Sequence, residues 1–453
     1  MDEQRLERAL RQGPPFATRY VPSSLALDDS PVVRGPINVG RLVLIIAVTA
    51  LLLVGMLAGL AALAAFRDED GGASNGWVAF ARYSDRSAGL VERDIYLVRE
   101  GEAARRIIGS DSDGLDEICP AFSPDGARLA HGEANGTEDT GYGGAALVVS
   151  DVDPEGNASE SLRIDVGGTF PPPCAIWSAD GRRVAFGVPL TSPLNPDRTA
   201  AGSEVWVATV ADGQVDVLPD LLATDLEWSP HGSELAIASG QTDLVTGNHL
   251  RDGSIRIYDA DSGDIRILVG PSGVTSLTWS PDGSRIAYQR GRSPDGDGID
   301  QEIWVAQVDG SGEYLLASGF SSIHGIGPVW SPTGDHIVYQ RCYENPCSGE
   351  AHEVVLVTPD GDNEVVLPPL GLPGTDASVT WRPWRVTWSP DGRELLYTAW
   401  SVELPRESTA LISVPLDRGS DPVMLHEDTN ISPYDGDHGR SVPIQSWARR
   451  PDA

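Results

Sequence analysis

The chain has 453 residues and a formal net charge of −33, and all 33 of its basic residues are arginine. This length exceeds what one ordinary hydrophobic core usually takes, so we expect several domains or one repetitive architecture. The negative charge argues against nucleic acid and other anionic polymers as partners, because binding them requires positive charge that neutralises phosphates or similar groups.

The first element in chain order is an N-terminal tail, residues 1–41, that we expect to be largely disordered. Its first residues, MDEQRLERALRQ, can form a short helix with Leu6 and Leu10 on one face. A helix of this length is marginal alone, so the tail either stays disordered or folds on a partner. A cytoplasmic regulator is therefore a candidate partner of the tail.

Residues 42–66, LVLIIAVTALLLVGMLAGLAALAAF, contain no charged side chain. As a helix this segment is about 37 Å long, enough to cross a hydrocarbon core about 30 Å thick. We predict a single transmembrane helix here, followed by an acidic, glycine-rich linker at residues 67–75. A cleaved signal peptide is the alternative, because Ala62-Leu63-Ala64 offers a small-residue cleavage pattern, but the long preceding tail favours a retained anchor.

The flanks of this span predict its orientation. Arginines precede it, whereas Arg67 follows it and is succeeded by three acidic residues, which favours a cytoplasmic N-terminus. All four cysteines lie beyond the span, and an even number is consistent with disulfides in an oxidising exterior. We predict a single-pass protein of the cell membrane with an extracytoplasmic C-terminal domain, residues 76–450.

A motif of the type WSPDG recurs in this domain at nearly constant spacing. Each copy is followed by alternating apolar residues and by two more strand-like segments, so each unit is predicted to contain four short strands. Proline fixes φ in the turn, and glycine takes the left-handed position that reverses the chain. The regular spacing indicates a repeat array. The aromatic residues of the motif are Phe122, Trp177, Trp228, Trp279, Trp330 and Trp388.

The two ends of the array complement each other. The segment after the linker matches the second, third and fourth strands of a unit, and Trp447 near the C-terminus occupies the aromatic position of a first strand. Pairing of the two ends would close a ring and remove most exposed sheet edges. The expected fold is all-β, a seven-bladed β-propeller of four-stranded blades with one-plus-three closure, preceded by a single transmembrane helix.

The (F/W)SPDG-x-x-(I/L/V)-A-(F/Y) core resembles the TolB-type propeller repeat, which is similar in shape to WD-repeat propellers, and it covers residues 76–450. The resemblance implies a β-propeller. It is less specific for function, because propellers of this type serve as interaction domains, as lids on peptidases and occasionally as enzymes. TolB itself is soluble and periplasmic, with six blades and an extra N-terminal domain, so its role is not carried over.

The motif aspartates offer a candidate ring of carboxylates. His231 and Thr333 stand in their place in two units that keep the glycine. A turn tolerates these replacements and a metal ring does not, so we predict a turn role for the aspartates. The aspartates are Asp125, Asp180, Asp282 and Asp391.

No catalytic residue is predicted. GASNG, residues 72–76, matches the G-x-S-x-G nucleophile pattern, but a linker precedes it and a strand follows it, whereas that motif needs a strand and then a helix. The chain has no lysine that could act as a base, and its eight histidines are scattered singly. We predict no cofactor either, apart from the calcium considered next.

Asp295, Asp297, Asp300 and Glu302 place carboxylate oxygens around glycines in the predicted loop DGDGIDQE. Calcium takes about six to eight oxygen ligands, so a calcium site is chemically feasible here. The loop lacks the EF-hand spacing, and acidic, glycine-rich loops are common in an acidic protein. A solvated loop is the favoured interpretation.

The cysteines are interpreted as structural. Cys119 and Cys174 each stand three residues before the motif aromatic of adjacent units, so a cross-blade disulfide is expected, stabilising by about 4 kcal/mol in the chain-entropy model. Cys342 and Cys347 bracket a short loop and are expected to form a local disulfide that contributes about 2 kcal/mol.

Three functional hypotheses remain. The leading one is a single-pass envelope protein whose propeller binds an envelope protein or a small ligand, as a sensor or scaffold, at a loop-lined face or the mouth of the channel. The alternative is a propeller enzyme that acts on polysaccharide or peptide at the channel mouth. The third is a structural scaffold with loops stiffened by calcium.

Overall fold

The computed structural model describes residues 77–83, 93–109, 114–137, 141–167, 174–189, 203–242, 249–291, 301–320, 327–342, 352–368, 370, 381–403, 406–417, 421–428 and 446–447. All of them belong to the compact unit Gly71–Ala453. Within these ranges no helix is long and apolar enough to cross a membrane. The predicted tail, transmembrane span and linker, residues 1–75, lie outside them.

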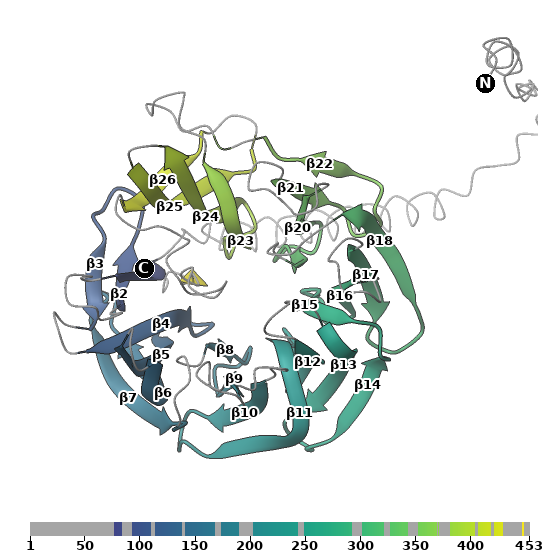
Figure 1. Cartoon of the computed structure of the whole chain (residues 1–453), viewed down its shortest axis with the longest axis horizontal. Helices are drawn as coiled ribbons and strands as arrows, with labels where there is room; N and C mark the ends of the chain where they lie inside the picture. Colours follow the sequence, from purple (N-terminus) through teal and green to yellow (C-terminus); the bar gives the residue numbers. More distant parts are fainter. Residues whose placement is uncertain are drawn as a thin grey trace, which may run out of the picture. The chain divides into compact units, whose positions relative to one another are not determined.

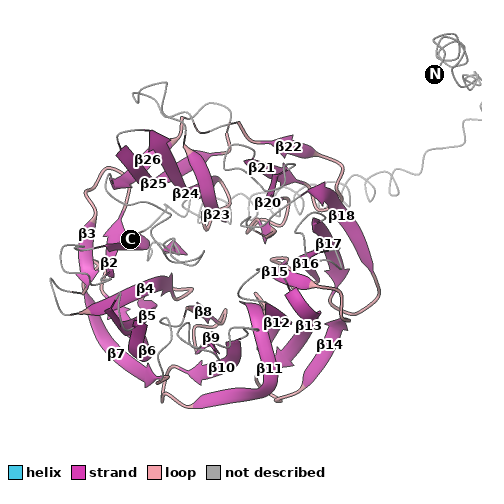
Figure 2. Cartoon of the chain, viewed as in Figure 1, coloured by secondary structure: helices cyan, strands magenta, loops and turns pink. Residues whose placement is uncertain are grey.

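The described elements are all β-strands, joined by turns and loops (Figure 2). The first half of the chain contains β1 (Val78–Tyr83), β2 (Arg93–Val98), β3 (Arg105–Ile108), β4 (Leu115–Phe122), β5 (Arg128–Thr137), β6 (Gly141–Val152), β7 (Ala158–Asp165), β8 (Ala175–Trp177), β9 (Arg183–Pro189), β10 (Ser203–Thr209), β11 (Val215–Trp228), β12 (Glu234–Thr242), β13 (His249–Asp259) and β14 (Ile265–Val269).

The second half continues the same pattern. It contains β15 (Val274–Trp279), β16 (Arg285–Gly291), β17 (Gln301–Gln307), β18 (Glu313–Phe320), β19 (Val329–Trp330), β20 (Ile337–Cys342), β21 (His352–Val357), β22 (Glu364–Val366), β23 (Arg382–Trp388), β24 (Glu394–Glu403), β25 (Arg406–Pro415), β26 (Val423–Asp428) and β27 (Ser446–Trp447).

The strands form antiparallel sheets, five of four strands and one of seven. In the seven-stranded sheet, β11 pairs with β10 between Val215 and Ala223 and with β12 between Ala223 and Trp228, so this one strand serves two consecutive groups. Counted in this way, the sheets comprise seven four-stranded units. We number them in chain order: unit 1 is β27-β1-β2-β3, unit 2 is β4–β7, unit 3 is β8–β11, unit 4 is β11–β14, unit 5 is β15–β18, unit 6 is β19–β22 and unit 7 is β23–β26.

The predicted pairing of the two ends of the array is confirmed. Strand β27 pairs antiparallel with β1, with Trp447 opposite Val78 and Ser446 opposite Ala79. The C-terminal segment therefore supplies the first strand of unit 1, and the segment that follows the linker supplies the other three.

Apolar clusters connect each unit to the next. Six of them combine side chains of consecutive units from unit 1 to unit 7. A further cluster joins Leu396 and Leu411 of unit 7 to Val78 and Phe80 of unit 1. The packing is thus cyclic, and Figure 1 shows the units following one another around a circle. Each unit buries both faces of its sheet against its neighbours, as in a β-propeller.

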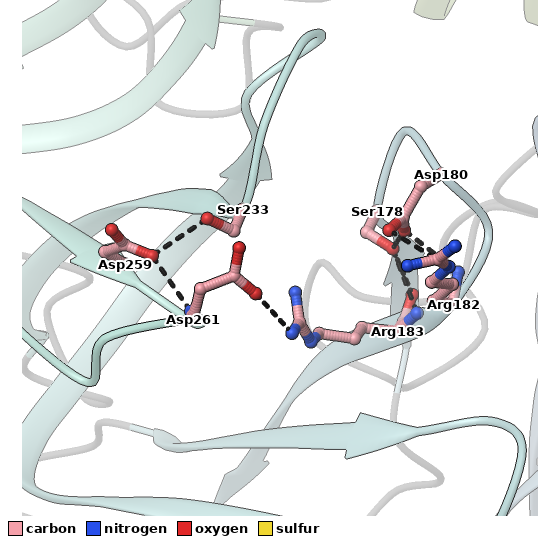
Figure 3. A network of polar contacts seen from close by, with 7 residues as sticks. All are labelled: Ser178, Asp180, Arg182, Arg183, Ser233, Asp259 and Asp261. Atoms are coloured by element: carbon pink, nitrogen blue, oxygen red, sulfur yellow. Dashed lines mark hydrogen bonds and ion pairs between the residues drawn. The ribbon is translucent and has the colours of Figure 1, made fainter.

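The motif aspartates have the predicted turn role. Ser178 Oγ donates to Asp180 Oδ1 at 2.7 Å and accepts from the backbone N–H of Arg183 at 2.9 Å, while the backbone N–H of Arg182 donates to Asp180 Oδ1 at 3.0 Å (Figure 3). The Arg183 guanidinium also reaches Asp261 of unit 4 at 2.6 Å. The turn is therefore held by its own side chains.

The same turn network is formed around Asp125, Asp282 and Asp391. Hydrogen bonds from Ser280 and from the backbone at Ser284 lower the pKa of Asp282 to about 2. These carboxylates are acceptors within their own turns, which explains why they recur.

The motif tryptophan links neighbouring units. In four units its indole N–H donates a hydrogen bond to a backbone carbonyl on the inner strand of the preceding unit, at 2.9–3.3 Å. A carbonyl on the inner edge of a sheet has no strand partner, so this bond satisfies it and fixes the spacing between units. The donor and acceptor pairs are Trp177 with Ala121, Trp228 with Ile176, Trp279 with Glu227, and Trp388 with Val329.

The indole bond predicts a difference between two substitutions. Trp279 donates to the Glu227 carbonyl, whereas the buried Trp330 Nε1 has no hydrogen-bond partner in the described part of the chain. Both Trp279→Phe and Trp330→Phe lose packing, but only the first leaves a carbonyl without its donor. We expect Trp279→Phe to destabilise the fold by about 1 kcal/mol more than Trp330→Phe in thermal or urea unfolding. Equal losses would show that the indole bond contributes nothing.

Candidate functional site

One position of the repeat recurs in the first strand, or just before it, in units 2 to 7. It lies three residues before the motif aromatic, and we call it the axial position. The disulfide between Cys119 and Cys174, with Cα atoms 5.2 Å apart, joins the axial positions of units 2 and 3. A side chain at Gly327 would collide with the Ser276 hydroxyl, so units 5 and 6 also meet here. In units 2 to 7 the axial residues are Cys119, Cys174, Asp225, Ser276, Gly327 and Arg385.

Two carboxylates of unit 4 reach the inner edge of unit 5. Asp225 accepts hydrogen bonds from the backbone N–H groups of Leu226 at 2.9 Å and Leu277 at 3.0 Å. Glu227, two residues further along β11, accepts from the backbone N–H of Trp279 at 2.8 Å. Strand β15 is the edge of its sheet, so these bonds satisfy donors that no strand pairs.

Both carboxyl groups hold protons more tightly than usual. Burial raises the pKa of Asp225 to about 6, against the opposing effect of its backbone hydrogen bonds. Burial raises the pKa of Glu227 to about 8, and the negative charge of Asp225 adds to the increase. At neutral pH Glu227 is therefore mostly protonated. Carboxyl groups with such pKa values mark functional sites as well as structural ones.

Arg385 is the only positively charged axial residue among those that the structure describes. Its side chain is exposed, and it makes no hydrogen bond or ion pair with any described residue. Its pKa is nevertheless lowered, because the surrounding protein disfavours its charge, and the Asp225 carboxylate opposes this effect. Units 4 and 7 are not neighbours, so their charges interact across the centre of the ring.

The candidate site is therefore a central one. It combines a guanidinium whose donors have no partner among the described residues and two carboxyl groups that can exchange protons near neutral pH. Such a site can hold a polar or charged ligand, and a carboxyl group with a pKa near 7 can also transfer protons.

The predicted calcium site is not brought together within the described residues. Asp295, Asp297 and Asp300 lie outside them. Glu302 is buried and accepts from Arg290 Nε at 3.0 Å and Trp304 Nε1 at 2.8 Å, so its carboxylate already has partners. In the part of the chain that the structure covers, no three metal-ligating side chains gather. The calcium site stays a prediction.

The cysteine pairs have different outcomes. The bond between Cys119 and Cys174 is present, at the axial position described above. Cys342 is also disulfide-bonded, and Cys347, its expected partner, lies outside the described residues.

His131 is a further buried titratable group, but it lies apart from the axial residues, on β5. Both ring nitrogens lack a hydrogen-bond partner in the described structure. Burial lowers its pKa to about 3, with a further contribution from the charge of Arg163. A neutral imidazole without partners acts as a packing group, so we do not include it in the site.

The sequence analysis missed Asp225, Glu227 and Arg385. A signal was available, because Asp225 and Arg385 occupy the same column of the repeat as Cys119 and Cys174. Comparison of this position in all the repeats would have placed these four residues together at the centre of the predicted ring.

Comparisons with known proteins agree with the propeller fold. A model of the WD domain, G-beta repeat, matches residues 263–288. No curated protein matches the chain.

Solved structures give the broader likeness. A putative TolB from Agrobacterium tumefaciens is 18% identical, covering 59% of this chain and 85% of that one, with a TM-score of 0.40. A periplasmic gluconolactonase of Pseudomonas aeruginosa is 14% identical, covering 77% and 99%, with a TM-score of 0.46. A prolyl endopeptidase is 15% identical, covering 80% of this chain and 52% of that one, with a TM-score of 0.50. At 15% identity the match to the prolyl endopeptidase shows a likeness of fold alone.

The raised pKa values predict how stability depends on pH. The folded protein binds more protons than the unfolded chain between the ordinary values of 3.8 and 4.5 and the folded values of about 6 and about 8. This contribution to stability is therefore greatest below that range and falls as pH rises through it. We expect the melting temperature of Glu227→Gln to fall less than that of the wild type between about pH 5 and about pH 8.

The exposed Glu155 provides the control for this measurement, and Glu155→Gln should keep the slope of the wild type. An unchanged slope in Glu227→Gln would contradict the assignment of the raised pKa to this group.

Proposed function

We propose that this chain is a single-pass envelope protein whose extracytoplasmic propeller is a protein- or ligand-binding module, acting as a sensor or scaffold. The observation that carries this proposal is Arg385, an exposed cation that makes no hydrogen bond or ion pair with any described residue. A small number of accessible polar groups of this kind usually anchor and orient a ligand.

The location outside the membrane is supported by two features. Residues 42–66 have the length and composition of a transmembrane helix. The disulfide Cys119–Cys174 is of a kind that persists in oxidising compartments. The N-terminal tail would then lie in the cytoplasm, where a regulator could bind it and respond to occupancy of the propeller.

The topology distinguishes two faces of the ring. In antiparallel units, the turns between first and second strands and between third and fourth strands lie on one face, and the other connections lie on the opposite face. The first kind includes the short motif turns. The second kind includes the longer connections in the sequence, from Pro189 at the end of β9 to Ser203 at the start of β10 and from Gly291 at the end of β16 to Gln301 at the start of β17. Binding residues concentrate on long connections, so the second face is the proposed entrance to the axial site.

A test uses the full chain with an affinity tag, purified from its own membranes after mild cross-linking. We expect mass spectrometry to recover an envelope protein or a small molecule with the wild type, and much less of it with Arg385→Glu. Arg393→Glu is the matched control, because Arg393 is exposed in a motif turn on the other face. If nothing specific is recovered with the wild type, or if both variants behave alike, the binding proposal is wrong.

The pKa of Glu227 favours a second candidate, an enzyme that acts on polysaccharide or peptide at the channel mouth. A carboxyl group with a pKa of about 8 is protonated at neutral pH and can serve as a general acid. The binding proposal predicts no turnover of glycan and peptide libraries by the purified chain. Turnover that Glu227→Gln abolishes, without loss of folding, would instead support the enzyme.

A further inference from the structure

The axial residues also indicate what kind of ligand the ring would hold. Resting on the proposed binding function, we infer that the axial site binds a small molecule with a single carboxylate, held by the guanidinium of Arg385 with uptake of a proton by the axial carboxyl group of Asp225. The site is assigned from the placement of Arg385, Asp225 and Glu227 on inner strands that face one another across the ring.

The guanidinium determines the charge and shape of the ligand. Arginine presents planar, forked N–H donors that match the two oxygens of a carboxylate. Arg385 uses none of these donors within the described structure, and its exposure leaves them open to a ligand. The protein around it disfavours its isolated charge, so an anion that pairs with it would relieve this cost.

The other axial residues limit the ligand to one negative charge. The protein carries −33 overall, which repels polyanions such as acidic polymers. Apart from Arg385, the described axial residues are neutral except Asp225, whose carboxylate interacts with Arg385 across the ring. A second negative charge on the ligand would have no described axial cation to pair with.

The Asp225 carboxyl group couples binding to protons. When Asp225 is protonated, the negative charge that interacts with Arg385 is removed. Binding of an anion at Arg385 therefore raises the pKa of Asp225 further and takes up a proton. By linkage, the affinity for the anion rises as pH falls through the value of about 6.

Other charged groups on the inner strands contribute less. Asp116 on β4 is already paired with Arg93 through two hydrogen bonds at 2.6 and 2.7 Å. Glu117 on the same strand is buried. Strand β23 carries Arg382 besides Arg385, and the structure does not describe the Arg382 side chain. The Arg385 charge acts on Asp225, and the Asp225 charge acts on Glu227.

The experiment uses the purified full chain in detergent and propionate as the probe. Binding is measured by isothermal titration and by the melting temperature at matched ionic strength, at about pH 5.5 and about pH 8. Propionamide has the same shape without the charge, and succinate has a second carboxylate. We expect saturable binding of propionate that is stronger at the lower pH, weaker binding of succinate, and no binding of propionamide.

Three variants assign the effect to residues. Arg385→Gln removes the charge but keeps hydrogen-bonding capacity, and we expect it to lower the affinity for propionate at least about tenfold. Arg393→Gln, in an exposed motif turn, should bind like the wild type. Asp225→Asn should bind propionate more tightly than the wild type at about pH 8 and lose most of the pH dependence.

The outcomes separate this inference from the proposed function. If Arg385→Gln binds propionate as the wild type does, or if the wild type binds propionate and propionamide equally, the anion site is wrong. If the wild type binds no carboxylate but still recovers a partner that depends on Arg385, the binding function stands and the ligand class fails. If neither a ligand nor a partner is found, both proposals fail together.

Discussion

The structure depends on the packing of each sheet against the next. A four-stranded antiparallel sheet has two faces to bury, and every unit buries them against its two neighbours through an apolar cluster. Units 1 and 7 satisfy the same requirement only because β24 and β25 pack on β1 and β2, and because β27 returns to pair with β1. Closure is therefore a condition of stability for the whole array, and it joins the two ends of the domain.

Closure creates a second constraint at the centre. In every unit except unit 4 the inner strand is a sheet edge whose backbone groups need partners, and the repeat meets this need with different side chains. Motif indoles satisfy carbonyl groups, and Asp225 and Glu227 satisfy N–H groups of β15. Cys119 and Cys174 instead fix two inner strands covalently. Arg385 occupies the same repeat position but satisfies no backbone group among the described residues. This is why we assign the binding of a ligand to it.

The same geometry links the chemistry of the centre to pH. Seven units that converge on an axis surround the axial side chains with protein, so the charged forms of Asp225 and Glu227 are disfavoured. The same surroundings disfavour the positive charge of Arg385 and lower its pKa. A ligand that neutralises the arginine changes the proton affinity of the Asp225 carboxyl group across the ring. Binding of an anion at the centre is therefore coupled to proton uptake.

Local chemistry made much of this fold predictable from the sequence alone. The Ser-Pro-Asp-Gly turns, the alternating strands and the completion of unit 1 by Trp447 follow from short-range conformational preferences and from counting repeats. The continuity of β11 between two units and the lack of a partner for the Trp330 indole did not follow, because they depend on the spacing of neighbouring sheets. The electrostatic interaction across the ring was likewise decided by tertiary structure, since Asp225 and Arg385 are distant in sequence and their charges interact only once the ring is formed.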